Sequence, residues 1–322
     1  HLYTEDQFKN FRDYPIPDMQ KTDLSTEMID IFRMNDVNSI GEMRLFFNQL
    51  IDPPDEIFIK SALMILYALG AITSMNNEGT VTEIGDAISK FRSLKPTHAK
   101  SILSAYYNWC KEEVIDIISI ITSMDGQLSR LLPPYRPPKK GSEYGITRKE
   151  FDTIRSKIIH KYGDHLTLLK IYEIFKKKQN SMSGGELKKW CKENYINYNV
   201  LNKTKKTAQE INRTMSSLRV QNRNNKNNKS IKVLNLDLNI NNVPQKAGSL
   251  NNLEKYFSIN DSLKNKEDKI LKSLLDGCYI NVALQMNKNK YISCFPPKKV
   301  EATLDRDTTI KTFGKVCMYD EL

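Results

Sequence analysis

Residues 66–85 read LYALGAITSMNNEGTVTEIG, and this stretch decides how the first part of the chain folds. An apolar stripe with the four- and three-residue steps of a buried helix face leads into it. The stripe consists of Phe58, Ala62, Ile65 and Leu69. Gly70 suits the left-handed residue that follows a helix end. Short apolar runs on either side of the turn NNEG then predict a hairpin. A helix followed by a two-stranded wing is the outline of a winged helix.

Upstream of this stretch, the prolines decide where helices are allowed. Pro15 and Pro17 exclude a helix through their surroundings. Residues 51–54 (IDPP) read as a helix start, with Asp52 as the cap and the two prolines in the first turn. We therefore expect a helix from about residue 52 to Leu69.

Downstream, the apolar spacing is helical for most of the chain up to residue 218. Three stripes carry this prediction. They are Ile102, Ala105, Tyr106 and Trp109; Val114, Ile117, Ile118 and Ile121; and Leu201, Thr204, Ala208, Ile211, Met215 and Leu218. Further helices are expected from Lys149 towards Tyr162, after an N-cap at Asp164, and from Glu186 to Tyr195 with Trp190 in the core.

The last third of the chain differs in character. Eleven of the 34 residues from 219 to 252 are asparagine, which predicts a mobile low-complexity insertion. A helix is expected over Lys269–Met286, followed by strands at Tyr291–Phe295 and Val300–Leu304. The sequence therefore predicts a mainly α chain with small β parts.

The positive charge is concentrated in the middle of the chain. Residues 1–138 carry a net charge of −6, residues 139–230 carry +14 and residues 231–322 carry +3. A basic block of this kind attracts nucleic acid, since each neutralised phosphate releases counterions. A solvated basic face without a ligand is the alternative. The candidate nucleic-acid-binding residues are Lys139, Lys140, Lys188, Lys189, Lys192, Tyr198, Lys203, Lys205, Lys206 and Arg213.

No catalytic or metal site is expected in this sequence. The phosphate-binding loop G-x-x-x-x-G-K-[ST], the dinucleotide motif G-x-G-x-x-G and the patterns G-x-S-x-G and H-E-x-x-H are absent. Five unpaired-looking cysteines favour a reducing intracellular compartment such as cytoplasm, nucleus or viral factory. No apolar run approaches the roughly 20 residues of a membrane span, so no membrane association is expected.

Several stretches match, in order, the signatures of a known family of nucleic-acid motors. The matching stretches are His1–Thr4, loosely Glu27–Phe58, residues 66–72 and 79–85, Gly163–Leu169 (GDHLTLL), Trp190–Tyr198 (WCKENYINY), and Leu274–Gly277 with Asn281–Ala283. Together they resemble the helicase-associated region of DEAH/RHA helicases. Asn199 departs from the arginine usual there, and Lys203, Lys205 or Lys206 is expected to substitute. The end of the chain, with FPPKKV at 295–300, looks like relatives in large DNA viruses.

The resemblance implies an order of parts. Residues 1–20 would be the tail of the second RecA-like domain, 21–86 a winged helix, and 87–218 a helical ratchet bundle. The Asn-rich insertion at 219–252 would precede, at 253–322, a helix and the start of a truncated OB-like barrel. In the family these parts close a tunnel for single-stranded RNA over two motor domains that bind ATP and Mg²⁺. The expected partners are therefore single-stranded RNA or DNA, the motor domains of the same protein, and an activator protein at the OB-like end.

Two other readings remain open at this point. A non-enzymatic winged-helix factor that binds nucleic acid would also explain why no motor motif is present. A docking platform for other proteins is the third reading, because the OB-like end receives activators in the family. Fold alone does not choose among these three.

Overall fold

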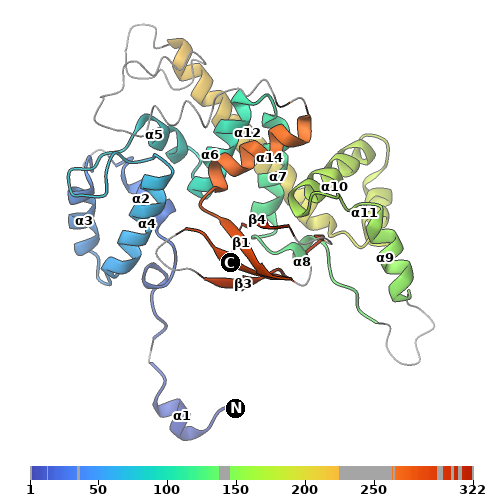
Figure 1. The fold of residues 1–322 in the computed structure, drawn as a ribbon, viewed down its shortest axis with the longest axis horizontal. Helices are drawn as coiled ribbons and strands as arrows, with labels where there is room; N and C mark the ends of the chain where they lie inside the picture. The colour runs from blue at the N-terminus through green and yellow to red at the C-terminus, as the bar shows by residue number, and fades with distance from the viewer. Residues whose placement is uncertain are drawn as a thin grey trace. The chain divides into compact units, whose positions relative to one another are not determined.

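The computed structural model of the chain divides into two compact units, His1–Arg92 and Ser93–Leu322, which are described separately (Figure 1). A set of ranges is described: residues 2–12, 14–34, 37–137, 146–224 (backbone alone at 219–224), 263, 265–295, 300–305, 308–310 and 314–320. The predicted insertion over 219–252 lies outside these ranges from residue 225 onwards. Its first six residues continue a helix.

The described part of the first unit is helical apart from one hairpin. Its elements are α1 (Glu5–Lys9), a 3-10 turn (Asp18–Gln20), α2 (Ser25–Ile31), α3 (Ile40–Asn48), α4 (Glu56–Ala68) and α5 (Glu83–Ser89). The predicted start of α4 was wrong, because the cap residue is Asp55 rather than Asp52 and both prolines precede the helix. The predicted stripe was half right. Ala62 and Leu69 are fully buried, but Phe58 and Ile65 are only half-buried, and the helix buries Ile59, Leu63 and Leu66 as well. Because α4 is apolar around most of its circumference, spacing alone did not determine its innermost face.

The predicted hairpin after α4 is confirmed. Gly70 adopts a left-handed φ of 73°, which lets the chain turn back at the helix end. Ile72 then pairs with Val81 in an antiparallel bridge, and the amide of Thr73 donates to the carbonyl of Thr80 over 2.9 Å. The first unit therefore contains the predicted helix followed by a short hairpin.

Among the glycines compared in this unit, Gly85 leaves the least room for a side chain. A Cβ at this position of α5 would lie 2.1 Å from the carbonyl oxygen of Ala71 and 2.6 Å from the side chain of Val81. That carbonyl also accepts the amide of Thr82, so it cannot move away without opening the hairpin. We expect Gly85→Ala to lower the free energy of unfolding by about 2 kcal/mol, measured by urea denaturation.

The matched control is Gly184→Ala in the second unit, where a Cβ meets no atom within 4 Å. This change is expected to leave stability unchanged or slightly raised, since alanine is the better helix former. Equal unfolding midpoints for Gly85→Ala and the wild type would show that α5 does not press on the hairpin.

The second unit is built around α7 (Lys111–Ser123), which contacts α6, α10, α12 and α14 (Figure 1). Its predicted stripe is confirmed, because Val114, Ile117, Ile118 and Ile121 are all buried. The other helices of this unit are α6 (Pro96–Tyr107), α8 (Leu128–Leu131), α9 (Arg148–Ser156), α10 (Asp164–Gln179), α11 (Gly184–Glu193), α12 (Tyr198–Asn224) and α14 (Lys266–Cys278).

The long helix α12 follows its predicted stripe closely, with Leu201, Ile211 and Met215 buried and Ala208 half-buried. The stripe on α6 was wrong at its last member. Trp109 lies beyond the helix end and is 77% exposed.

A four-stranded antiparallel sheet follows α14, in the order β3-β2-β1-β4. Its strands are β1 (Val282–Asn287), β2 (Lys290–Ser293), β3 (Glu301–Thr303) and β4 (Val316–Met318). The two predicted strands correspond to β2 and β3. The predicted helix over 269–286 is confirmed as far as Cys278, where α14 ends, and was wrong beyond it, because residues from Val282 onwards form β1. β1 shows a strand's alternation at Ala283, which is buried, and Leu284, which is exposed and pairs with Ile292 and Val316.

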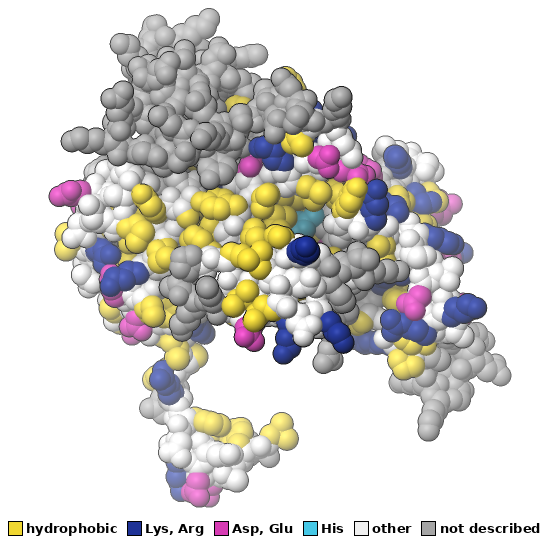
Figure 2. Space-filling view, viewed as in Figure 1, with side chains coloured by type: hydrophobic (Ala, Val, Ile, Leu, Met, Phe, Trp, Pro, Cys, Tyr) yellow, Lys and Arg dark blue, Asp and Glu magenta, His cyan; other side chains and the backbone are white. Residues whose placement is uncertain are grey.

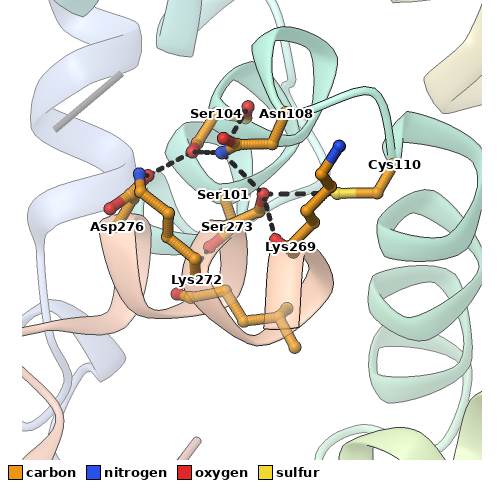
Figure 3. Close-up of polar contacts among 9 residues, drawn as sticks. Ser101, Ser104, Asn108, Cys110, Lys269, Lys272, Ser273 and Asp276 are labelled. Atoms are coloured by element: carbon orange, nitrogen blue, oxygen red, sulfur yellow. Dashed lines mark hydrogen bonds and ion pairs between the residues drawn. The ribbon is translucent and has the colours of Figure 1, made fainter. Parts of the chain in front are cut away.

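α14 packs on α6 through small and polar side chains rather than through a purely apolar seam. Figure 3 shows Ser273 between Asn108 and Cys110, and Asp276 beside Ser104 and Lys272. Asn108 donates to the Ser273 hydroxyl over 3.0 Å, and the Ser104 hydroxyl donates to the Asp276 carboxylate. Burial raises the pKa of Asp276, and the hydrogen bonds that its carboxylate accepts from Ser104 and Lys272 oppose that effect. The residues that fix α14 are therefore largely buried and hydrogen-bonded.

The end of the chain is held by the beginnings of two helices. Gly163, with a φ of 100°, is the N-cap of α10, so the prediction of Asp164 as the cap was wrong. The Asp164 carboxylate instead accepts the amide of Thr309 over 2.6 Å and the hydroxyl of Thr308 over 2.7 Å. The imidazole of His98 lies 2.6 Å from the carboxylate of Asp320. The segment that ends the sheet is thus attached to α6 and α10.

Candidate nucleic-acid interface

The short helix α11 carries three of the predicted lysines. It begins with a capping box, in which the Glu186 amide donates to the Ser183 hydroxyl and the Ser183 amide donates to the Glu186 carboxylate over 2.8 Å. Hydrogen bonding by the backbone amide and side chain of Ser183 lowers the pKa of the Glu186 carboxyl. Leu187 and Cys191 form the buried side of the helix. The remaining faces expose Lys188, Lys189 and Lys192.

Two half-buried aromatic rings lie under lysine ammonium groups at this helix. The Nζ of Lys188 is 5.4 Å from the centre of the Tyr198 ring, at the start of α12. The Nζ of Lys178, at the end of α10, is 5.2 Å from the centre of the Trp190 ring. The Tyr198 ring also meets Phe175 edge-on, with centroids 6.1 Å apart. Tyr198 and Lys188 are therefore brought together by the fold, and Trp190, predicted as a core residue, is only half-buried.

The end of α10 adds positive charge that the sequence analysis did not include in the interface. The three lysines 176–178 had been interpreted only as complements of the helix dipole. Lys176 donates to the buried carboxylate of Asp116. Burial raises the pKa of Asp116, and the contact with Lys176 partly offsets this increase. Lys177 is exposed, and Lys178 lies over Trp190. The run of three lysines was the available signal for Lys177 and Lys178.

The predicted residues on α12 do not share one face. At 3.6 residues per turn, Lys206 and Arg213 lie opposite the buried stripe, whereas Lys203 and Lys205 lie on its two different flanks. All four are exposed. The ammonium of Lys203 lies 3.9 Å from the carboxylate of Asp125. The sequence thus identified exposed cations, but the helix separates them into three directions.

The described cations form a broad basic surface rather than a closed pocket. Figure 2 shows Lys and Arg side chains spread over the region that α9, α10 and α11 form at the right of Figure 1. One of them, Lys189, lies 4.0 Å from Glu193, an exposed ion pair of small energetic value. The predicted residues Lys139 and Lys140 lie outside the described residues. We call Lys178, Lys188, Lys189, Lys192, Trp190 and Tyr198 the α11 surface.

Chemically, this surface is suited to binding anions and flat rings, because the side chains that define it are ammonium ions and aromatic rings. Within the described ranges, no group of three or more His, Cys, Asp or Glu side chains could hold a metal ion. A cavity of about 510 Å³ lies elsewhere in the second unit, lined by residues of α7, α10 and the sheet such as Ile121, Leu168 and Tyr291. None of the predicted interface residues lines it.

All five cysteines are free thiols. Among the helices that the structure describes, none is long and apolar enough to cross a membrane.

Comparison with known proteins gives a consistent picture. The chain is 35% identical over 197 residues to the ATP-dependent RNA helicase DHX33 of Mus musculus. The aligned stretch covers 61% of the chain and 24% of the relative. It is 26% identical over 212 residues to the putative ATP-dependent RNA helicase L540 of Acanthamoeba polyphaga mimivirus, which covers 65% of the chain and 28% of the relative.

A third relative is the probable ATP-dependent RNA helicase DHX35 homolog of Caenorhabditis elegans, 24% identical over 68% of the chain and 26% of the relative. No protein-family model matches the chain. The chain spans about a quarter of the length of the curated relatives it matches. The resemblance to DEAH-type ATP-dependent RNA helicases is thereby confirmed, and the chain is homologous to a part of these proteins.

Proposed function

We propose that this chain is a nucleic-acid-binding accessory region of an ATP-dependent RNA helicase. In this proposal it helps to close a tunnel for single-stranded RNA over RecA-like motor domains that lie outside the chain. ATP and Mg²⁺ would be bound by those motor domains, since the chain lacks the phosphate-binding loop. The observation that carries the proposal is the α11 surface, in a chain whose relatives are named RNA helicases.

The chemistry of the α11 surface supports contact with a single strand. Exposed lysines attract phosphates at any sequence, which is what a translocating motor requires of its track. Trp190 and Tyr198 are half-buried rings beside these cations, and unpaired bases stack on aromatic side chains. A duplex hides its base faces, so the combination favours a single strand.

The division of labour among the parts is also part of the proposal. The helix and hairpin of the first unit would serve as the winged helix, and helices α6–α12 would serve as the ratchet bundle. The sheet β3-β2-β1-β4 would begin the OB-like part, where an activator protein would bind. The helicase relatives favour this scheme over the winged-helix factor without a motor.

The test is binding of the chain to fluorescein-labelled oligouridylate, oligothymidylate and an RNA duplex, measured by fluorescence anisotropy over a range of salt. We expect preference for the single strands and a steep loss of affinity with salt. Preference for the duplex would support the winged-helix factor instead. Absence of binding at low salt would contradict the proposal for this chain.

A further inference from the structure

Trp109 stands out at the corner between α6 and α7. Its side chain is 77% exposed, and its φ of 59° lies in the left-handed region. A positive φ is unusual for a bulky residue and is a sign of backbone strain. The strain arises because Trp109 occupies the position after the C-cap of α6, where the amide of Cys110 donates to the carbonyl of Ala105 over 3.0 Å. Glycine is the residue that this position usually favours.

The corner around Trp109 is polar rather than apolar. The Cys110 thiol lies 3.3 Å from the Ser273 hydroxyl, which brings α14 beside the corner. Figure 3 shows the Lys269 side chain of α14 beside Cys110, the residue that follows Trp109. The residues that follow the corner in α7 form two ion pairs, between Lys111 and Glu112 at 2.8 Å and between Glu113 and Lys266 of α14 at 2.5 Å. The exposed ring of Trp109 is thus followed closely along the chain by charged residues.

These surroundings decide which partner the ring fits. A protein-docking patch needs a contiguous apolar area, which one tryptophan among charged side chains does not supply. A nucleobase needs only a flat ring and a cation near the adjoining phosphate, and such stacking tolerates any base. The combination of Trp109 and Lys269 therefore favours a nucleic acid over a protein.

We propose that Trp109 is a stacking platform for an unpaired base of single-stranded nucleic acid, with Lys269 beside the adjoining phosphate. This inference rests on the proposed function, because it needs a single strand bound to the second unit. It adds a contact at the α6–α7 corner to those of the α11 surface. It also explains why a residue that strains the backbone occupies a position suited to glycine.

Substitution separates stacking from structure unusually well at this position. Trp109→Gly relieves the left-handed strain, so we expect a melting temperature no lower than that of the wild type. Its affinity for a 12-residue oligouridylate should nevertheless fall about tenfold, whereas Trp109→Phe should retain most of the affinity. A 12-unit abasic ribose-phosphate oligomer is the matched ligand control. It should bind the wild type and Trp109→Gly equally, because it offers phosphates but no bases.

A direct readout comes from ¹⁹F NMR of the protein labelled with 5-fluorotryptophan. The chain has two tryptophans, so two resonances are expected. Trp109→Phe assigns the Trp109 resonance by its loss. We expect this resonance to shift on addition of oligouridylate and to stay in place with the abasic oligomer.

The possible failures are distinguishable. If oligouridylate binds but the Trp109 resonance does not move and Trp109→Gly binds equally well, the stacking proposal is overturned and the proposed function stands; the exposed ring would then be left to a protein partner. If Trp109→Gly melts at a lower temperature and loses affinity for both oligomers, the residue is structural and the proposal is overturned. If oligouridylate does not bind at all, both the inference and the proposed function fail.

Discussion

Replacing Lys188, Lys189 and Lys192 together with glutamate is expected to weaken binding of single-stranded RNA by about 100-fold at moderate salt. These three lysines are exposed on one short helix, and the half-buried Tyr198 ring lies beneath the ammonium of Lys188. Each lysine that neutralises a phosphate contributes about 0.7 to the slope of log affinity against log salt for a single strand. The slope should therefore become shallower by about two, which anisotropy titrations at several salt concentrations measure directly.

A matched control removes the effect of net charge. Lys9, Lys21 and Lys60 of the first unit are exposed, and each forms a surface ion pair with a nearby acid. Replacing these three with glutamate changes the net charge by the same amount, but in the other compact unit of the chain. If the control lost as much affinity as the α11 variant, binding would depend on overall charge rather than on this surface.

The parts of the fold that the sequence predicted well are those that depend on residues close together along the chain. The stripes of α7 and α12 were placed correctly because their apolar residues recur at helical spacing against a polar remainder. The hairpin after α4 was predicted because Gly70 and the NNEG turn are local signals. In each case the residues concerned are neighbours along the chain.

The errors occurred where packing between distant segments decides the secondary structure, the helix cap or the burial of a residue. β1 was taken as the end of a helix, because the apolar run that follows α14 fits either period over so few residues. Asp164 was expected to cap its own helix, but its carboxylate binds Thr308 and Thr309, more than 140 residues away. Trp109 was assigned to a buried stripe because the end of α6 could not be located from spacing alone.

The candidate site divides in the same way. That the lysines of α11 are exposed follows from the positions of Leu187 and Cys191 on the same helix. That Lys188 lies over Tyr198, and Lys178 over Trp190, depends on how three helices meet and has no signature in the sequence. The sequence could therefore supply the list of exposed cations but not their grouping with the aromatic rings.

Gly277→Ala is expected to lower the free energy of unfolding of the second unit by about 3 kcal/mol, the upper part of the range for overpacking. A Cβ at Gly277 would lie 2.2 Å from both the Ser101 hydroxyl and the carbonyl oxygen of Thr97, and 2.6 Å from the Ser101 amide. Two of these three atoms belong to the backbone of α6, so no rotamer change relieves the contact. α14 must instead move away, which breaks its hydrogen bonds to Ser104 and Asn108.

Urea denaturation measures the loss of stability, and thiol reactivity shows where it occurs. Burial raises the pKa of Cys278, the last residue of α14, to about 12, so this thiol is protonated and unreactive at pH 8 in the intact protein. Gly277→Ala should make one additional thiol reactive towards a colorimetric disulfide reagent. Gly185→Ala, where a Cβ meets no atom within 4 Å, is the control and should change neither quantity.

A second substitution tests whether the close approach itself causes the loss. Ser101→Ala removes the hydroxyl oxygen from the position that the new Cβ needs, but it leaves the carbonyl of Thr97 in place. The double variant Ser101→Ala/Gly277→Ala should therefore recover part of the lost stability and not all of it, with a coupling energy of about 1 kcal/mol in a double-mutant cycle. Strict additivity of the two substitutions would contradict a direct contact between the new Cβ and the Ser101 hydroxyl.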